Sequence, residues 1–221
     1  SLYTSFSRSF QPNTSLRVDG SLLEPVRGTQ YEVGVRGEFL NGRLTTNLAA
    51  YELTRSNIPA PDPDNRGFFI PVGEQRSRGI ELDVTGEILP GWNIIASYAH
   101  TDARVTKDNN LQPGNLLGGV PFNSASLWST YEIQTGDLQG LGFGLGLFYV
   151  GERQGDLNNS FQMPGYTRTD ASVFYRRDNW QAGININNLF NINYIESGGA
   201  FRSRIDPGAP LTVRGTLSVE F

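Results

Sequence analysis

Apolar and polar residues alternate along most of this chain, and the stretch from Leu211 to Phe221 shows the pattern most clearly. Side chains alternate with a period of two along a strand. One face therefore carries Leu211, Val213, Leu217, Val219 and Phe221, and the other carries Thr212, Arg214, Thr216, Ser218 and Glu220. An apolar-faced edge strand invites aggregation in a soluble domain, whereas a closed transmembrane barrel pairs that edge and turns the apolar face to lipid. The pattern favours a barrel strand.

The same alternation predicts an all-β chain of about ten antiparallel transmembrane strands. The expected spans are 2–8, 29–40, 43–56, 75–88, 92–105, 123–135, 141–153, 167–177, 179–188 and 211–221. We expect Val33, Leu82, Leu145, Ile184 and Leu217 to face outward, and Glu32, Glu81, Asn185 and Thr216 to face inward. Charges in a small closed core are costly unless paired, so a wide barrel whose lumen holds water or another domain fits better.

The strand expected at 43–56 is an exception to the alternation. Leu44, Leu48 and Ala50 are in phase, but Tyr51 and Leu53 are not. Either a bulge or a different register would account for this.

Short and long connections alternate between the expected strands. Short links fall at 40–43, 89–91, 134–140 and 177–178, and long ones at 9–28, 57–74, 106–122, 154–166 and 189–210. Outer-membrane barrels have short periplasmic turns and long extracellular loops. Phe39, Trp92 and Trp180 lie beside short turns, and Tyr98 and Tyr149 lie nearer the long loops, which suits two interfacial girdles of aromatic residues.

Composition alone would suggest a soluble protein. The 221 residues are 38% hydrophobic with a net charge of −4, and no run approaches the roughly 18 apolar residues of a membrane helix. A barrel wall meets lipid only at every second residue, so its mean hydropathy can match that of a soluble protein. No basic patch points to nucleic acid. No signal peptide is present and the chain starts inside an alternating segment, so we expect a piece of a longer protein.

Four ordered motifs cover nearly the whole chain. They are Leu2-Tyr3-Thr4-Ser5-Phe6-Ser7-Arg8-Ser9-Phe10-Gln11-Pro12, Gly28-Thr29-Gln30-Tyr31-Glu32-Val33-Gly34, Arg78-Gly79-Ile80-Glu81-Leu82-Asp83 and Asn187-Asn188-Leu189-Phe190-Asn191-Ile192-Asn193-Tyr194. Together with the terminal Phe221, they resemble the barrel of TonB-dependent outer-membrane receptors, specifically ferric-siderophore receptors of the ferrichrome type.

This resemblance implies a 22-stranded barrel plugged by an amino-terminal domain, of which residues 1–221 are the carboxyl-terminal part. The plug, the earlier strands and the TonB-contacting segment would lie outside this chain, so we expect an open sheet with 2–8 and 211–221 as unpaired edges. The implied function is TonB-energised uptake of a ferric siderophore across a Gram-negative outer membrane, without catalysis or cofactor. The implied partners are that chelate, the TonB complex, the plug, outer-membrane lipid and lipopolysaccharide.

The last long connection contains Phe201-Arg202-Ser203-Arg204. An aromatic beside two arginines can receive an anionic or aryl-bearing chelate through charged hydrogen bonds and cation–π contact. In the family that the chain resembles, an aromatic of the last loop contacts cargo, so Phe201, Arg202 and Arg204 are the candidate substrate-binding residues. The alternative is that the arginines pair with carboxylates such as Asp206 or with lipopolysaccharide phosphates.

Other candidates for chemistry have plainer interpretations. His100 has no evident nucleophile partner, and Glu81 with Asp83 is expected to line a solvated lumen. Asp62-Pro63-Asp64-Asn65 lacks the ligand spacing of a calcium loop and predicts a stiff turn. Glycines at 142, 144 and 146 are expected to leave a smooth inner surface that the plug can approach closely.

Several alternatives stay open from the sequence. They are a passive porin-type channel, a receptor of the same family for cobalamin or haem, a barrel enzyme with a site near the loops, and a soluble β-sandwich. The ordered motifs argue against the porin, the lack of a catalytic constellation against the enzyme, and the inward charges against the sandwich.

Overall fold

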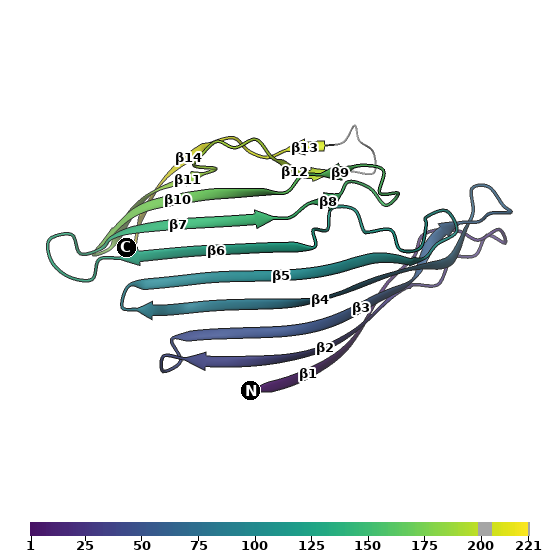
Figure 1. Ribbon diagram of the computed structural model, residues 1–221, viewed down its shortest axis with the longest axis horizontal. Helices are drawn as coiled ribbons and strands as arrows, with labels where there is room; N and C mark the ends of the chain where they lie inside the picture. Colours follow the sequence, from purple (N-terminus) through teal and green to yellow (C-terminus); the bar gives the residue numbers. More distant parts are fainter. Residues whose placement is uncertain (199–204, 221) are drawn as a thin grey trace.

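The computed structural model describes residues 1–198 and 205–220, and most of these residues form one curved antiparallel sheet (Figure 1). Its strands are β1 (Leu2–Gln11), β2 (Val26–Phe39), β3 (Leu44–Pro61), β4 (Phe69–Leu89), β5 (Trp92–Lys107), β6 (Asn123–Glu132), β7 (Leu141–Val150), β10 (Tyr166–Arg177), β11 (Trp180–Asn187) and β14 (Thr212–Val219). Two hairpins lie in the connections: β8 (Arg153–Gln154) with β9 (Gln162–Met163), and β12 (Ile195–Gly198) with β13 (Ile205–Pro207).

Each strand of the ten-stranded sheet pairs with the next one along the chain, in the order β1-β2-β3-β4-β5-β6-β7-β10-β11-β14. β1 and β14 form the two edges and do not pair with each other. This confirms the expected open sheet. Phe221 lies outside the described residues.

The two faces of the sheet differ as the alternation predicts. The register puts Val33, Leu82, Leu145, Ile184 and Leu217 on one face, which we call the outer face. These side chains are exposed, with Ile184 at 51% and Leu217 at 72%. Glu32, Glu81, Asn185 and Thr216 lie on the opposite, inner face. No closed interior buries the apolar set, which is the arrangement of a wall that meets lipid.

The out-of-phase residues of β3 need no bulge. β3 pairs with both neighbours without a shift from Leu44 to Arg55. Tyr51 and Leu53 are therefore inner-face residues. The Tyr51 hydroxyl lies 3.4 Å from the side-chain oxygens of Ser77 and Thr101, so the inner face holds this aromatic through polar contacts.

Several strands run further than the sequence predicts. The connection expected at 57–74 shortens to 62–68, because Ala60 pairs with Ile70 and Pro61 with Phe69. Register shifts follow Arg55, and Asn57 takes a φ of 60°. Proline has no N–H to donate to a ladder and is tolerated at such bulges, which is why a proline-rich stretch can still be a strand.

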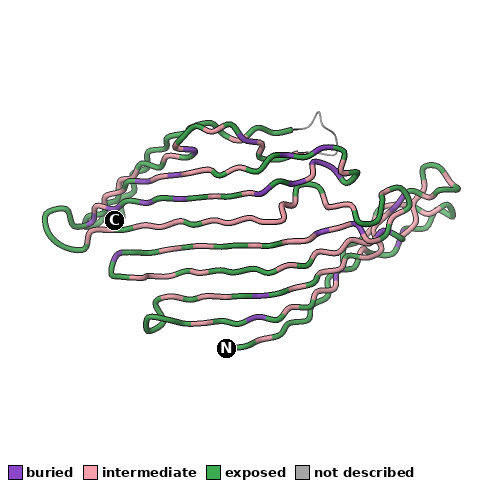
Figure 2. Tube along the Cα trace, in the orientation of Figure 1, coloured by how far each residue is buried: buried purple, intermediate pink, exposed green. Residues whose placement is uncertain are grey.

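Most of the described chain is exposed or half-buried, and its buried stretches are short and scattered (Figure 2). The buried apolar residues are few, and most of them lie in or beside the long connections. They include Leu23, Ala60, Ala103, Val105, Phe161, Met163 and Tyr194. Within the described ranges, no helix has the length and hydropathy that crossing a membrane requires.

Candidate functional site

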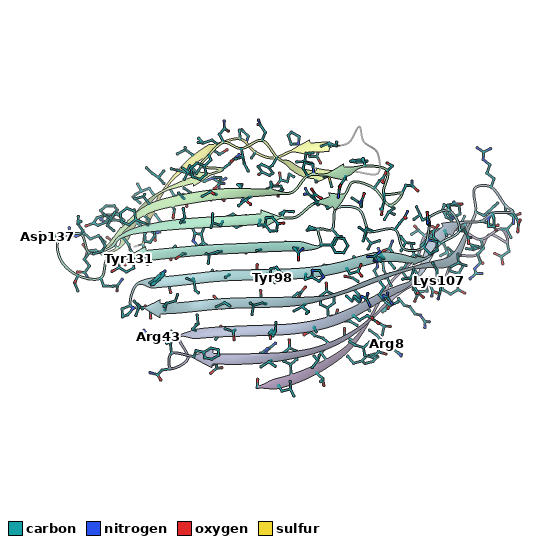
Figure 3. All side chains as sticks on the ribbon, in the orientation of Figure 1. Arg8, Arg43, Tyr98, Lys107, Tyr131 and Asp137 are labelled. Atoms are coloured by element: carbon teal, nitrogen blue, oxygen red, sulfur yellow. The ribbon has the colours of Figure 1, made fainter. Side chains whose placement is uncertain are left out.

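The long connections all leave one end of the sheet, and we call this end the rim. Figure 3 places Lys107 at the rim and Asp137 and Arg43, both in short turns, at the opposite end. Among the described residues, the rim comprises 12–25, 62–68, 108–122, 151–165, 188–198 and 205–211. Three of these connections are fastened to one another by the contacts described below.

The connection 108–122 folds back along the edge of β5. β6 pairs with only the lower part of β5, which leaves the upper backbone without a strand partner. The Thr101 N–H donates to the Phe122 oxygen at 2.9 Å, and the Leu117 N–H donates to the Ala103 oxygen at 2.9 Å. Backbone of the connection thus satisfies the ladder groups that a strand would otherwise meet.

Asn159 joins the connection 151–165 to the connection 108–122. Its Oδ1 accepts from the Leu116 N–H and its Nδ2 donates to the Leu116 oxygen, both at 2.8 Å. Asn159 has a φ of 54°, in the left-handed region that asparagine tolerates better than most residues. A second link runs from Asn115 Nδ2 to the Leu157 oxygen at 2.9 Å. The side-chain amide of Asn159 therefore makes with Leu116 the pair of hydrogen bonds that a backbone peptide group of a neighbouring strand would make.

Asp156 shapes the turn that presents Asn159. Its carboxylate accepts from Ser160 Oγ at 2.5 Å and from the Ser160 N–H at 2.8 Å. These hydrogen bonds, the hydroxyl first, lower the pKa of the Asp156 carboxyl below the usual aspartate value.

Arg153 joins the connection 151–165 to the β12–β13 hairpin. It is 4% exposed, and its Nη2 donates to the backbone oxygens of Ile195 at 2.7 Å and Glu196 at 3.0 Å. Its guanidinium stands 5.7 Å from the Tyr166 ring centroid, and Nη1 has no hydrogen-bond partner. Gly198 lies against Met163 nearby, where a Cβ would clash with the sulfur. A buried cation therefore fixes the base of this hairpin.

Asn188 is the buried asparagine of the segment 187–194. It is 1% exposed, and its Nδ2 donates to the Ile192 oxygen at 2.9 Å and the Ala209 oxygen at 3.0 Å. Its N–H donates to Asp170 Oδ1 at 2.8 Å. This one side chain binds both ends of the connection that leaves β11.

Arg168 and Tyr194 complete a polar cluster on the inner face. Arg168 binds both Asp170 oxygens at 3.0 Å, and its Nη1 donates to the Tyr194 hydroxyl at 3.3 Å. The Tyr194 ring packs on Tyr166 with centroids 4.4 Å apart. The last connection is therefore anchored on the inner side of the wall.

The predicted substrate-binding residues Phe201, Arg202 and Arg204 lie outside the described residues. Arg153 and Asn159 position the rim but were not predicted as site residues, and Asn188 was part of a motif whose structural role was not predicted. The available signal for the two asparagines was their residue type in a loop, since asparagine tolerates the positive φ that both adopt, 54° for Asn159 and 53° for Asn188.

The other sequence candidates occupy the places expected of them. His100 lies on the outer face, where its Nδ1 is 2.9 Å from Asn123 Oδ1. Glu81 and Asp83 share the inner face. Asp62 accepts from the Asp64 N–H at 2.9 Å, which closes a turn. Among residues 1–198 and 205–220, no group of three His, Cys, Asp or Glu side chains is placed to hold a metal ion.

The glycines of β7 do not leave a smooth surface, so that expectation is wrong. A Cβ at Gly142 would strike the Phe174 ring, and one at Gly146 would strike the Trp128 ring. Aromatic side chains from the neighbouring strands lie across the glycines and fill the space. The inner face here is an aromatic patch, flanked by Arg168 4.8 Å from the Phe148 centroid and Arg176 5.7 Å from that of Phe174.

An antiparallel wall with an apolar outer face, short turns at one end and interlocked long loops at the other defines an outer-membrane β-barrel. The chain belongs to the TonB dependent receptor-like β-barrel family, which matches residues 1–189. This is a family of transporters rather than enzymes, and it places the wall in the Gram-negative outer membrane.

Similar proteins agree with this membership. The chain is 37% identical over 222 residues to the metal-pseudopaline receptor of Pseudomonas aeruginosa, covering 100% of the chain and 31% of the relative. It is 38% identical over 200 residues to the ferrichrome outer membrane transporter/phage receptor of Escherichia coli, covering 88% and 27%. The crystal structure of the siderophore receptor PiuA from Acinetobacter baumannii superposes with a TM-score of 0.87 at 26% identity, covering 99% of the chain and 33% of that structure. The chain thus spans about a third of the length of these relatives.

Proposed function

We propose that this chain is the carboxyl-terminal wall of an active outer-membrane transporter that takes up a metal–siderophore chelate with energy from TonB. The identity to the metal-pseudopaline receptor along the full length of the chain carries the proposal. The ferripyoverdine receptor of Pseudomonas aeruginosa bound to ferripyoverdine supports it, since that structure superposes with a TM-score of 0.84 at 26% identity. The ferric chelate is the first candidate cargo.

The last connection is the proposed cargo contact. Phe201, Arg202 and Arg204 follow β12, whose base is fixed by Arg153 and by the cluster around Tyr194. An anchored loop base supports a defined position for an arginine and aromatic pair, because less ordering entropy is lost when cargo binds.

Unpaired carboxylates on the inner face are consistent with contact to a separate plug domain, which the family resemblance implies. Glu32 on β2 and Glu81 with Asp83 on β4 lie on this face on either side of β3, and the three form no salt bridge within the described ranges. We propose that basic side chains of the plug supply their counter-charge. Partly hydrated ion pairs are weak individually, which suits a domain that must move.

The test is uptake of radiolabelled chelates by whole cells that carry the full-length receptor, with and without TonB. We expect TonB-dependent, saturable uptake of at least one ferric chelate, and replacement of Phe201, Arg202 and Arg204 with Ala should weaken binding about tenfold or more. Arg66→Ala, in the connection 62–68, is the matched control. Uptake that persists without TonB and rises linearly with concentration would identify a passive channel instead.

One relative is a metal-pseudopaline receptor, a name that does not specify iron, so we propose a chelate of a metal other than iron as a second candidate cargo. Nickel, zinc and cobalt complexes of the same chelators belong in the same assay. Competition between them and the ferric form would show whether the chelator or the metal is selected.

A further inference from the structure

Arg177 places a charge on the outer face at the short-turn end of the sheet. It ends β10 and lies directly opposite Trp180, which begins β11, with the two-residue turn Asp178-Asn179 between them. Outer-face residues at this end of other described strands are apolar or aromatic, and they include Phe39, Leu44, Trp92, Tyr131 and Leu141. Short turns of outer-membrane barrels lie on the periplasmic side. Because the apolar outer face ends here, Arg177 lies at the headgroup level of the periplasmic leaflet.

The two charges of this turn are only loosely paired. Arg177 Nε lies 3.9 Å from Asp178 Oδ2, and the two side chains are 65% and 84% exposed. An exposed ion pair at such a distance adds little stability. Arg43, in another short turn, is more fully engaged, since it donates to the Leu40 oxygen at 3.2 Å and lies 3.6 Å from Glu87. The turn after β10 therefore presents one cation and one anion that are both open to a ligand.

Two aromatic side chains beside Arg177 add hydrogen-bonding groups. Tyr175 and Trp180 pack edge to face with ring centroids 5.6 Å apart, and the Tyr175 hydroxyl accepts from Arg177 Nη1 at 3.5 Å. Trp180 Nε1 makes no hydrogen bond with a described residue, whereas Trp92 Nε1 donates to Ser129 Oγ at 2.9 Å. Directly opposite residues of paired strands have Cβ atoms about 4.5–5.5 Å apart. The Arg177 guanidinium and the Trp180 indole therefore lie within reach of one phosphate group.

An apolar hollow of about 440 Å³ lies next to this cluster, toward the middle of the membrane. Ala182 and Gly215 are the small outer-face residues that form it, and Tyr175, Ile184 and Leu217 stand around them. β11, which carries Ala182, is paired on both sides, so the floor of the hollow is a complete part of the wall. A hydrocarbon chain in this hollow covers apolar surface that would otherwise be left uncovered.

We propose that the outer face of β10, β11 and β14 binds a phospholipid of the periplasmic leaflet whose headgroup joins a phosphate to a primary ammonium. The phosphate lies at Arg177 and Trp180, the ammonium at Asp178, and one acyl chain in the hollow over Ala182. A headgroup with one charge of each sign complements a turn with one charge of each sign. A purely anionic headgroup would leave the carboxylate facing like charge. The proposal rests on the outer-membrane location of the wall and not on the identity of its cargo, so the uptake assay tests it in no respect.

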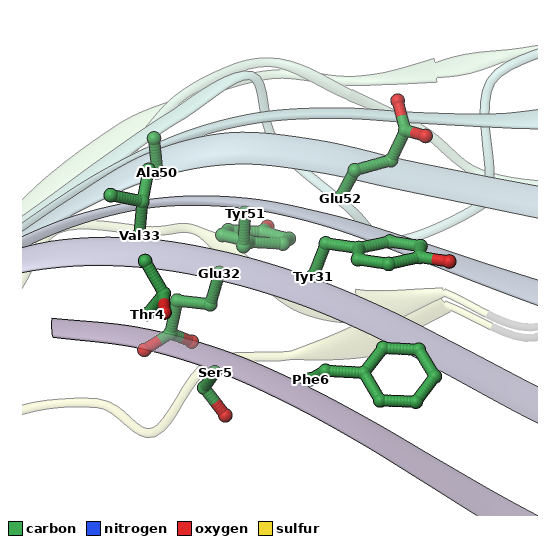
Figure 4. A pocket seen from close by; sticks show the side chains of 9 residues that line it. All are labelled: Thr4, Ser5, Phe6, Tyr31, Glu32, Val33, Ala50, Tyr51 and Glu52. Atoms are coloured by element: carbon green, nitrogen blue, oxygen red, sulfur yellow. The ribbon is translucent and has the colours of Figure 1, made fainter.

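A hollow of similar size elsewhere on the outer face provides a matched control. It has a volume of about 490 Å³, and Figure 4 shows Ala50 of β3 beside Val33 of β2 in it. The charged residues that line it are Glu32 and Glu52, so it offers no cation to a phosphate. Ala50→Leu therefore fills an apolar hollow as Ala182→Leu does, but leaves the proposed site intact.

The experiment uses the full-length receptor, purified in mild detergent, with dioleoyl phosphatidylethanolamine as the probe. Native mass spectrometry counts the lipids retained, and a titration gives the affinity of the most tightly bound one. Arg177→Gln should weaken this binding about tenfold or more, because it removes a charged hydrogen-bond donor. Ala182→Leu should weaken it by filling the hollow, whereas Ala50→Leu and Arg66→Gln should leave it unchanged. Heat-modifiable gel mobility verifies that each barrel is folded.

A second lipid tests the assignment of the headgroup. Dioleoyl phosphatidylglycerol has the same chains and a phosphate but no ammonium, so it should bind the unaltered receptor several-fold more weakly than the ethanolamine lipid. Asp178→Asn should abolish this difference by weakening the ethanolamine lipid alone. Free phosphoethanolamine at millimolar concentration should not displace the lipid, because it lacks the acyl chain.

Four results would each overturn the proposal. They are equal binding of the two lipids by the unaltered receptor, unchanged binding by Arg177→Gln, equal loss in Ala50→Leu and Ala182→Leu, and displacement by free phosphoethanolamine. Should Ala182→Leu fail to fold, Arg177→Gln and Asp178→Asn decide, since both change exposed side chains at a turn.

Discussion

Arg153 Nη2 donates a 2.7 Å hydrogen bond to the backbone oxygen of Ile195 across 42 residues of sequence. The guanidinium of Arg153 is held by peptide oxygens, with no carboxylate bound to it among the described residues. Burial of an unpaired charge is costly. The backbone oxygens of Ile195 and Glu196 and the Tyr166 ring therefore have to offset the cost of burying Arg153.

Replacement of Arg153 with Ala should release the β12–β13 hairpin without opening the sheet. Loss of hydrogen bonds to a charged group costs roughly 1.5–3 kcal/mol, so hydrogen exchange at 195–198 and 205–206 should accelerate about tenfold or more. Exchange in β10 and β11 should stay slow. Arg177→Ala, at an exposed turn, is the control, and unaltered exchange in the hairpin would contradict the role given to Arg153.

The outer face should penalise charge according to depth. Ile184 is 51% exposed near the middle of β11, whereas Leu217 pairs with Ala182 close to Trp180 and the short-turn end. Ile184→Arg should cost about 2–4 kcal/mol in unfolding free energy, and Leu217→Arg should cost less. Asn185→Arg, one residue away on the inner face, is the comparison. Equal costs at 184 and 185 would mean that the two faces are not lipid and lumen.

Replacement of glycine with alanine should have opposite effects at Gly146, which lies under the aromatic patch on β7, and at Gly215 on β14, which does not. Gly146→Ala overlaps the Trp128 ring and should destabilise the barrel by roughly 1–3 kcal/mol. Gly215→Ala meets open space and should be neutral or stabilising by up to about 1 kcal/mol. Urea unfolding followed by tryptophan fluorescence measures both. A harmless Gly146→Ala would show that the ring does not lie over that strand.

The turn around Asp156 should weaken in acid. Because the folded pKa of Asp156 is lowered, its hydrogen bonds add stability above the usual aspartate pKa, and this stability is lost as pH falls through the folded value. Ser160→Ala removes the largest cause and should raise the pKa of Asp156. Carboxyl carbon NMR of the labelled receptor measures this, with Asp62, in a separate turn, as the unchanged reference.

Periodicity predicted the wall well because each strand has one apolar and one polar face, so the shared outer face of Ile184 and Leu217 follows from it. It failed at Pro59 and Pro61, where composition suggested a loop and bulges allow a strand. It also failed at Gly146, because the residue that fills the space, Trp128, comes from another strand.

The rim could be located from the sequence but not assembled from it. Connection lengths identify which end carries the long loops. The contacts of Asn159 with Leu116 and of Arg153 with Ile195 join residues of different loops that are 43 and 42 positions apart in the sequence. No local pattern encodes which loop meets which, because each contact uses a side chain on one side and only backbone on the other.

That use of backbone partners has a consequence for how such receptors diversify. Leu116, Ile195 and Glu196 can change identity without loss of the hydrogen bonds that their peptide groups make, whereas a change in chain length near them would break those bonds. Substitutions at these three positions therefore keep the hydrogen bonds between the loops, whereas insertions near them break those bonds. A single loop taken from a relative would lack the side chains in the neighbouring loops that hold it. A new cargo preference should therefore require exchange of the connection 108–122, the connection 151–165 and the last connection together.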